Sequence, residues 1–187
     1  MATLTTFTAG TVIRAADVNA NFVALNTDIA GAMRTGYVNA VPVGNILTGV
    51  DALHQWTMPA NTIDTVGDGL IVHAQFVFAA NANTKTVKFN IGVGTALVMN
   101  STTAPNNKDL LVDLVVVYAT ASGFKVYGTP VLCGHVNGTS PTLESSVTGL
   151  SLSANPATAL TVGFTGQATD TDDIDQSYTL ISIFKAS

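Results

Sequence analysis

Charged residues are scarce in this chain. Seven lysines and arginines and twelve aspartates and glutamates make up 10% of its 187 residues, and the net charge is −5. The seven basic residues stand singly along the sequence, so they form no basic stripe of the kind that neutralises a phosphate backbone. The sequence therefore predicts no binding to nucleic acid.

Cysteines and long apolar runs are also lacking. The single cysteine, Cys133, excludes an intrachain disulfide framework, and its neighbours Val131 and Leu132 predict a small buried hydrophobic side chain. The longest apolar stretch, 110–118, is interrupted by Asp113 and is too short to span a membrane. The first six residues have neither the basic region nor the apolar core of a secretory signal. We expect no membrane association, no Sec export and a product that stays in the cytoplasm until something releases it.

The sequence offers little catalytic or metal-binding machinery. The three histidines, His54, His73 and His135, have no second histidine or cysteine at metal-ligand spacing, so structural roles are predicted for them. Residues 138–141 lack the second glycine of a nucleophile elbow and have proline after the serine. Residues 92–94 lack the third glycine of a phosphate-binding loop and are predicted to form a turn. No enzyme activity, cofactor or metal ion is expected.

One dense cluster of carboxylates lies near the C-terminus, at Asp170, Asp172, Asp173 and Asp175. The first two have the spacing of a calcium-binding loop, but Ile174 stands where a third oxygen ligand is expected, and no glycine occupies the sixth position. This pattern favours an acidic, solvated loop over a cation site.

Short strands are predicted over most of the chain. The clearest pattern is at 86–91, where Val87, Phe89 and Ile91 alternate with polar residues, as in a strand with one buried and one wet face. Strands are predicted at 53–58, 70–78, 86–91, 110–118, 124–127, 131–136, 148–152, 160–164 and 178–184. Eight or nine short strands predict an antiparallel β-sandwich. A jelly roll is favoured because strand spacing is unequal and several connections are long; an up-and-down barrel is the alternative.

A short amphipathic helix is predicted before the strands. Its apolar side chains recur at steps of four, three and four residues and therefore share one face. These side chains are Val18, Phe22, Leu25 and Ile29. Asp17 suits the start of the helix, and Gly36, after Met33 and Arg34, suits its end. The helix is expected to pack either on its own domain or on identical helices of neighbouring subunits.

Two regions follow from this pattern. Residues 1–50 are predicted to contain an arm, the helix and a linker over 37–50, and residues 51–187 the β-sandwich. Hydrophobic residues make up 47% of the chain, so threonine, serine and asparagine must cover much of the surface. Such a low-charge surface suits faces that are buried against copies of the chain or a larger assembly, the alternative being a monomer.

Several segments resemble proteins of tailed bacteriophages. Residues 7–11 and 15–22 are similar to a short leader in phage fibre and virion proteins, where it precedes a trimeric β domain. Residues 58–63, 67–70 and 80–87 resemble the first strands of a phage jelly-roll domain, and 178–184 resemble its closing strand.

This resemblance implies a non-enzymatic virion structural protein that forms a homotrimer and is assembled in the host cytoplasm. It implies capsid decoration, as a cement or head-fibre protein bound to the major capsid protein or another virion protein. The implied residues for particle anchoring and oligomerisation are Phe7, Val18, Phe22, Leu25 and Ile29. The alternative is a short tail-fibre protein that recognises a host surface glycan.

In that alternative, the loop at 170–175 contacts the glycan. Trp56, Tyr118 and Tyr127 are the aromatic side chains that could offer a face to a sugar ring, although a lone tryptophan near a strand is more often part of the core.

Overall fold

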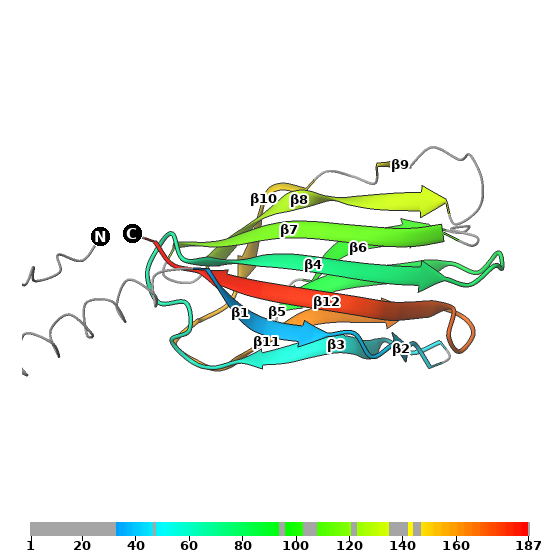
Figure 1. Cartoon of the computed structure of the whole chain (residues 1–187), viewed down its shortest axis with the longest axis horizontal. Coiled ribbons are helices and arrows are strands. Elements are labelled where there is room, and N and C mark those ends of the chain that lie inside the picture. Colours follow the sequence, from blue (N-terminus) through cyan, green and yellow to red (C-terminus); the bar gives the residue numbers. More distant parts are fainter. Residues whose placement is uncertain are drawn as a thin grey trace, which may run out of the picture.

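The computed structural model describes residues 33–46, 48–93, 96–102, 108–120, 123–134, 142–143 and 147–186. All regular elements in this part are strands, so the domain is mainly β, as predicted (Figure 1). The strands are β1 (Arg34–Asn39), β2 (Val43–Gly44), β3 (Asp51–Met58), β4 (Gly69–Phe78), β5 (Lys85–Ile91), β6 (Leu97–Thr102), β7 (Lys108–Thr120), β8 (Gly123–Gly134), β9 (Thr142–Leu143), β10 (Val147–Ser153), β11 (Leu160–Gln167) and β12 (Ile174–Phe184).

The strands form two antiparallel sheets. Sheet A has the order β1-β12-β4-β7-β8-β10, with β2 also paired to β12 and β9 to β8. Sheet B has the order β3-β11-β5-β6. One continuous cluster of buried apolar side chains contains residues of both sheets, so the sheets share a core.

Four of the strand pairs are nested along the chain. β5 pairs with β6, β4 with β7, β3 with β11, and β1 with β12. Each pair encloses the previous one, as if a single long hairpin had been rolled up so that its pairs alternate between the two sheets. Strands β8, β9 and β10 lie between β7 and β11 in the chain and widen sheet A beyond β7.

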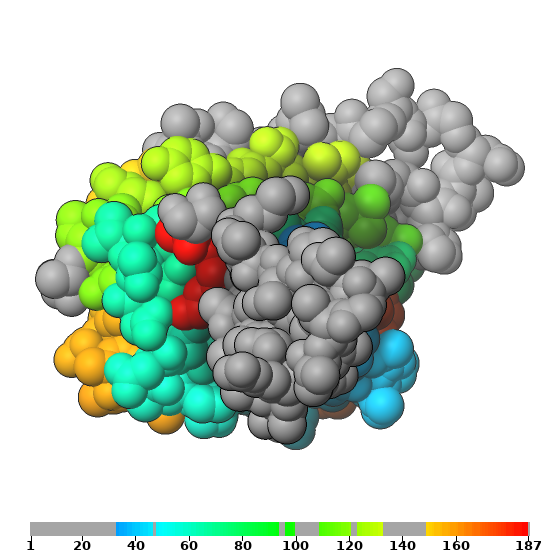
Figure 2. Space-filling view, turned by 60° about the vertical axis from the view of Figure 1, so that its left-hand side comes forward, coloured from blue at the N-terminus to red at the C-terminus, as the bar shows by residue number. Residues whose placement is uncertain are grey.

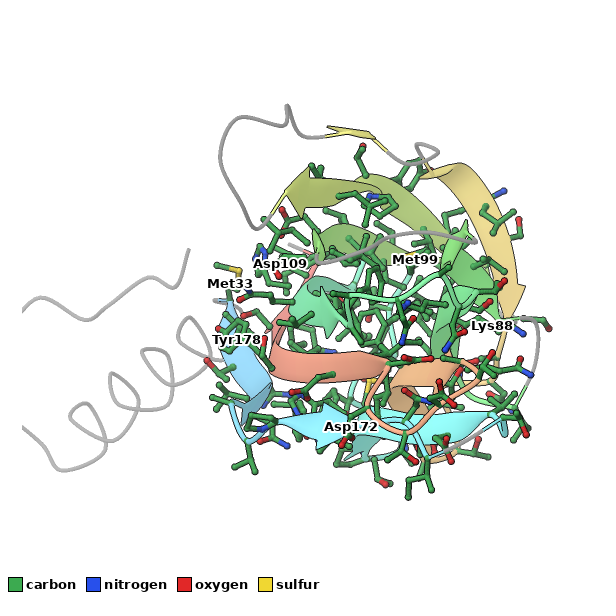
Figure 3. All side chains as sticks on the ribbon, turned by 90° about the vertical axis from the view of Figure 1, so that its right-hand side faces the viewer. Met33, Lys88, Met99, Asp109, Asp172 and Tyr178 are labelled. Atoms are coloured by element: carbon green, nitrogen blue, oxygen red, sulfur yellow. The ribbon has the colours of Figure 1, made fainter. Side chains whose placement is uncertain are left out.

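The core follows from the alternation of side chains along each strand. In β4, every second residue from Leu70 to Phe78 is buried. Phe76 of sheet A packs edge-on against Phe164 of sheet B, with ring centroids 5.1 Å apart, and Phe89 lies 5.4 Å from Phe164 on the other side. In Figure 3, side chains fill the space between the sheets: Met99 lies in this interior, Asp109 and Tyr178 on one outer side, and Lys88 on the opposite side.

Most predicted strands are confirmed, and β5 shows the predicted alternation of buried and half-buried residues. The two strands predicted at 124–127 and 131–136 are a single strand, β8, which runs through Pro130. β10 pairs with β8 up to Gly128, and β9 pairs with β8 from Val131 onward. Among the described residues, no strand on that side of β8 therefore needs an N–H from Pro130. Strands β1, β2, β6 and β9 were not predicted.

The segment 37–50, predicted to be a linker, contains the second half of β1 and all of β2. Both strands pair with β12, so the sheets begin at Arg34 rather than near Asp51. Gly36 lies within β1 and does not end a helix. A Cβ atom at Gly36 would lie 2.9 Å from the Trp56 ring and 3.1 Å from Ile183, so the glycine allows the close approach of β1 to the core.

Candidate functional site

The outer face of sheet A is the most unusual surface of the described domain. We use this name for the side of strands β1, β12, β4, β7 and β8 that points away from sheet B. Its side chains include Val38, Ile71, His73, Gln75, Val77, Asp109, Leu111, Asp113, Val115, Val117, Lys125, Tyr127, Thr129, Val131, Tyr178, Leu180, Ser182 and Phe184. Many of these are apolar, and Leu111, Val115 and Tyr127 keep 39%, 40% and 41% of their surface exposed.

A histidine and a carboxylate lie in the middle of this face. His73 of β4 and Asp113 of β7 are direct cross-strand neighbours, and the Nδ1 atom of His73 lies 2.5 Å from Oδ1 of Asp113. Both side chains are accessible, with 46% and 72% exposure. They border a hollow of about 230 Å³ whose other lining includes Ile71, Val115 and Tyr127. The pair orients the imidazole, but the described residues that line this apolar hollow include no serine, threonine, cysteine or lysine that could act as a nucleophile.

A buried carboxylate organises the end of the molecule where β4 connects to β5. Asp173 is 1% exposed and accepts hydrogen bonds from the side chain of Asn81, from Nδ2 of Asn83 at 2.8 Å and from the backbone N–H of Asp170 at 3.0 Å. Burial raises the pKa of Asp173, but these hydrogen bonds and the charge of Lys85 outweigh it and hold the pKa below its usual value.

The ammonium group of Lys85 belongs to the same network. Its Nζ donates to Oδ1 of Asn81 at 2.6 Å and to the backbone carbonyls of Asn81 and Asn83, both at 3.2 Å. Burial lowers the pKa of Lys85, and the nearby charge of Asp173 raises it in part. The lysine therefore closes the turn between β4 and β5 and compensates a buried carboxylate.

Asn45 fixes the acidic loop from the other side. Its side chain donates to the carbonyl of Asp170 at 2.9 Å and accepts from the N–H of Ile174 at 2.8 Å. The prediction of a solvated acidic loop holds for Asp170 and Asp172, which are exposed, and is wrong for Asp173. Among the described residues, no group of three or more histidine, cysteine or acidic side chains could hold a metal ion.

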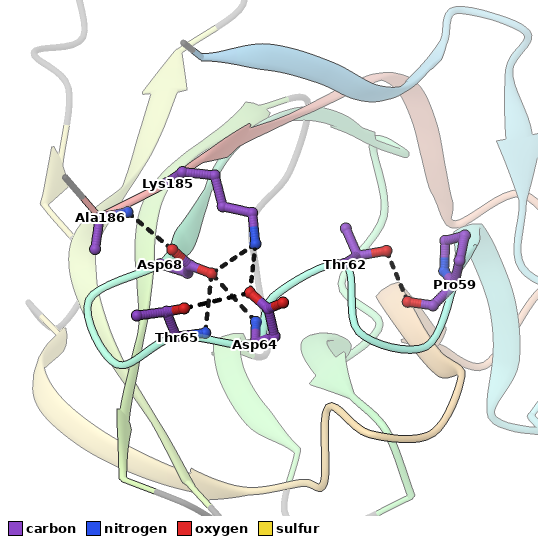
Figure 4. A network of polar contacts seen from close by, with 7 residues as sticks. All are labelled: Pro59, Thr62, Asp64, Thr65, Asp68, Lys185 and Ala186. Carbon is purple, nitrogen blue, oxygen red and sulfur yellow. Dashed lines mark hydrogen bonds and ion pairs between the residues drawn. The ribbon is translucent and has the colours of Figure 1, made fainter. Parts of the chain in front are cut away.

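A second buried carboxylate lies at the opposite end. Asp68, 1% exposed, accepts from Nζ of Lys185 at 2.7 Å and from the N–H groups of Ala186 at 2.8 Å and of Asp64 and Thr65 at 3.1 Å (Figure 4). Burial raises the pKa of Asp68, but these contacts outweigh it and lower the pKa to about 2. Figure 2 shows residues 59–68, in cyan to blue-green, beside the red C-terminal residues on this end.

His54 is structural, as predicted. It is 1% exposed; its Nδ1 atom lies 3.1 Å from Oγ1 of Thr179 and its Nε2 atom 2.7 Å from the carbonyl of Val41. Its backbone N–H donates to Oε1 of Gln176 at 2.8 Å. These contacts tie β3 to β12 across the two sheets.

The aromatic residues considered for glycan binding do not come together. Tyr118 is 7% exposed and packs on Phe124, so it offers no face to a ligand. Tyr127 lies on the outer face of sheet A. Trp56 is half-buried and borders a different hollow, of about 210 Å³, that is also lined by Arg34 and Pro59.

Several predicted residues lie outside the described part of the chain. These are the proposed anchor residues Phe7, Val18, Phe22, Leu25 and Ile29, together with His135 and the segment 138–141. Cys133 lies in β8, in register with Asp109 of β7. Within the ranges that the structure describes, there is no helix with the length and hydrophobicity needed to cross a membrane.

Comparisons of the chain with protein-family models, with curated proteins and with solved structures found no match.

Proposed function

We propose that this chain is a non-enzymatic structural protein of a tailed-bacteriophage virion, built as a jelly roll and assembled as a homotrimer. The observation that carries the proposal is the nested pairing of β5 with β6, β4 with β7, β3 with β11 and β1 with β12. Eight strands rolled up in this order form the double-sheet jelly roll, a fold that viral capsid proteins use. Strands β8 to β10 are an addition to one sheet.

The resemblance of residues 7–11 and 15–22 to a phage virion leader supports the location. In this proposal the jelly roll is the surface-exposed body of a capsid decoration or head-fibre protein, and residues 1–32 attach it to the major capsid protein or another virion protein. The apolar anchor residues are Phe7, Val18, Phe22, Leu25 and Ile29.

Cryo-electron microscopy of purified virions with icosahedral averaging tests the location. Density for the domain at symmetry-related capsid sites is the expected result. Domain density found only at the tail would favour the tail-fibre alternative, and a virion that lacks the protein would overturn the proposal.

The anchor can be tested separately with Phe22→Asp and Leu25→Asp, because a carboxylate buried in an apolar contact is costly to desolvate. Both variants are expected to keep the β-rich circular-dichroism spectrum but to be missing from particles. Thr27→Asp is the matched control, because residue 27 lies opposite Phe22 and Leu25 on the predicted helix. Normal incorporation of both apolar-site variants would contradict the anchor.

A receptor-binding tail protein is the second candidate, because Trp56 borders an open hollow beside Arg34 and Pro59, and an indole face suits a sugar ring. This role predicts saturable binding of host surface polysaccharide that Trp56→Ala abolishes and Tyr127→Ala leaves unchanged. Hydrolysis of that polysaccharide by the pure protein would instead indicate an enzyme.

A further inference from the structure

The two sheets differ in how their outer faces meet the solvent. Sheet B largely shows the usual alternation: apart from Val98, which is 47% exposed, its outward residues include Gln55, Thr57, Thr86, Lys88, Asn90, Thr161 and Thr165. An antiparallel sheet with one solvated face is expected to read this way. The outer face of sheet A does not, because β4 and β7 carry valine, leucine and isoleucine on both of their faces.

The outer face of sheet A carries exposed apolar side chains on both sides of the His73–Asp113 pair. The register places Ile71, Val115 and Tyr127 in one cross-strand row and Gln75, Leu111 and Val131 in another, with His73 and Asp113 in the row between them. The row of His73 continues onto β12 and β1 with Leu180 and with Val38, which is 59% exposed. Exposed apolar side chains gathered on one face in this way mark an interaction site.

The carboxylate at the centre of this face has a side-chain partner. Asp113 is in contact with His73, so a partner that covers the row does not bury an isolated carboxylate. Lys125 lies at one end of the face and donates to Ser151 and Gly149, whereas Asp109 lies at the other end and accepts from Gln75. Apolar side chains around one paired polar group, with further polar groups at both ends, match the arrangement of an interface core and its rim.

The size of the face also fits an oligomer. Five strands about 4.8 Å apart and eight steps of about 3.4 Å along them give a flat area of roughly 650 Å². A stable interface buries about 800 Å² on each partner, and interfaces between identical subunits are the more apolar ones. Two such faces, or one face and an equal area of a neighbouring subunit, exceed the roughly 1,000 Å² in total that a specific contact requires.

We infer that another copy of this chain covers the outer face of sheet A, with Leu111, Val115 and Tyr127 at the centre of the subunit contact. This inference rests on the homo-oligomer of the proposed function and assigns its interface to a particular surface. It also explains why so apolar a face is compatible with a chain that carries few charges: assembly removes the face from water.

Two substitutions at one position test the inference. Val115→Asp puts a charge at the centre of the face, and Val115→Thr changes polarity with almost no change in shape. Light scattering coupled to size-exclusion chromatography, over a range of protein concentrations, gives the mass of each assembly. The matched control is Thr161→Asp, an exposed strand position on the outer face of sheet B.

The wild-type chain is expected to have the mass of three copies, Val115→Asp the mass of one, and Val115→Thr at least a tenfold higher dissociation concentration. Thr161→Asp is expected to assemble as the wild type does. Circular dichroism and thermal melting check that the variants fold; if Val115→Asp does not fold, Val115→Thr decides the question.

An oligomer that both Val115 variants leave unchanged would overturn the inference, because another surface would then hold the copies together. A wild-type chain that is monomeric at every concentration would overturn it as well, and would point to residues 1–32 or a different virion protein as the cover. In either case the position of the protein on virions, seen by electron microscopy, decides the proposed function independently.

Discussion

Replacing Asp68 by asparagine is expected to lower the free energy of unfolding by about 2–4 kcal/mol at pH 7. The carboxylate is buried and accepts four hydrogen bonds, one from the ammonium group of Lys185 and three from backbone N–H groups. An asparagine has the same shape but only one acceptor oxygen, so its NH2 group would face donors. The loop 59–68 and the end of β12 would then lose their common attachment.

The pKa of Asp68 gives a second route to the magnitude. A shift of the pKa from its ordinary value of 3.8 to about 2 is worth about 2.5 kcal/mol of stability above pH 5. The pKa is lower in the folded state than in the unfolded state, so this contribution is complete above the unfolded value and is lost as the pH falls from about 4 towards 2. The two routes agree on a loss of about 2–3 kcal/mol.

Urea unfolding at pH 7 and at several values between pH 5 and pH 2 measures both effects. Wild-type stability should fall more steeply with acid than that of Asp68→Asn. Asp64→Asn is the matched control: Asp64 also contacts Lys185 at 2.7 Å but is 55% exposed, so a loss below about 1 kcal/mol is expected. A loss of unfolding free energy smaller than about 0.5 kcal/mol for Asp68→Asn would refute the reasoning. The same acid dependence of stability in the wild type and in Asp68→Asn would refute it as well.

Phe164→Ala should lower the free energy of unfolding by about 3–5 kcal/mol in urea, because it removes the ring that packs against Phe76 across the sheets; a loss below 1 kcal/mol would contradict the shared core. Gly163→Ala should cost at least about 2 kcal/mol, since φ is +154° and a new Cβ would lie 2.2 Å from the carbonyl oxygen of His54, and β11 must then move away from β3. An unchanged melting temperature would show that this approach is not tight. Lys85→Met should cost about 1–3 kcal/mol by leaving the turn carbonyls without their donor, and a more stable variant would show that the network is dispensable.

Local sequence patterns predicted most of the strands but not their limits. Strand β5 alternates strictly and is confirmed, and the apolar runs in β4 and β7 are long enough to identify. β1 was missed because its strand partner, β12, compensates for a glycine and an asparagine that are unfavourable in strands. Pro130 suggested a break in β8. It lies between the residues that pair with β10 and those that pair with β9, so no described strand on that side needs its N–H.

The candidate site was less accessible to sequence reasoning. Nothing in the sequence shows that Asp113 is the cross-strand neighbour of His73. The burial of Asp173 depends on Asn81 and Asn83, which come from a distant turn. The sequence did carry one signal of the outer face of sheet A. β7 has apolar residues on both of its faces, which is not typical of an antiparallel sheet with one solvated face.

The nested strand order has a consequence for synthesis of the chain on the ribosome. The pair β5–β6 is local and is available early, but β3 waits for β11 and β1 waits for β12, the last strand to be made. Pairings between distant segments form slowly, and unpaired strand edges are open to aggregation in the meantime. Loss of β12 would therefore remove the strand between β1 and β4, so that a prematurely terminated chain is left with an exposed edge at β4 and with β1 separated from sheet A.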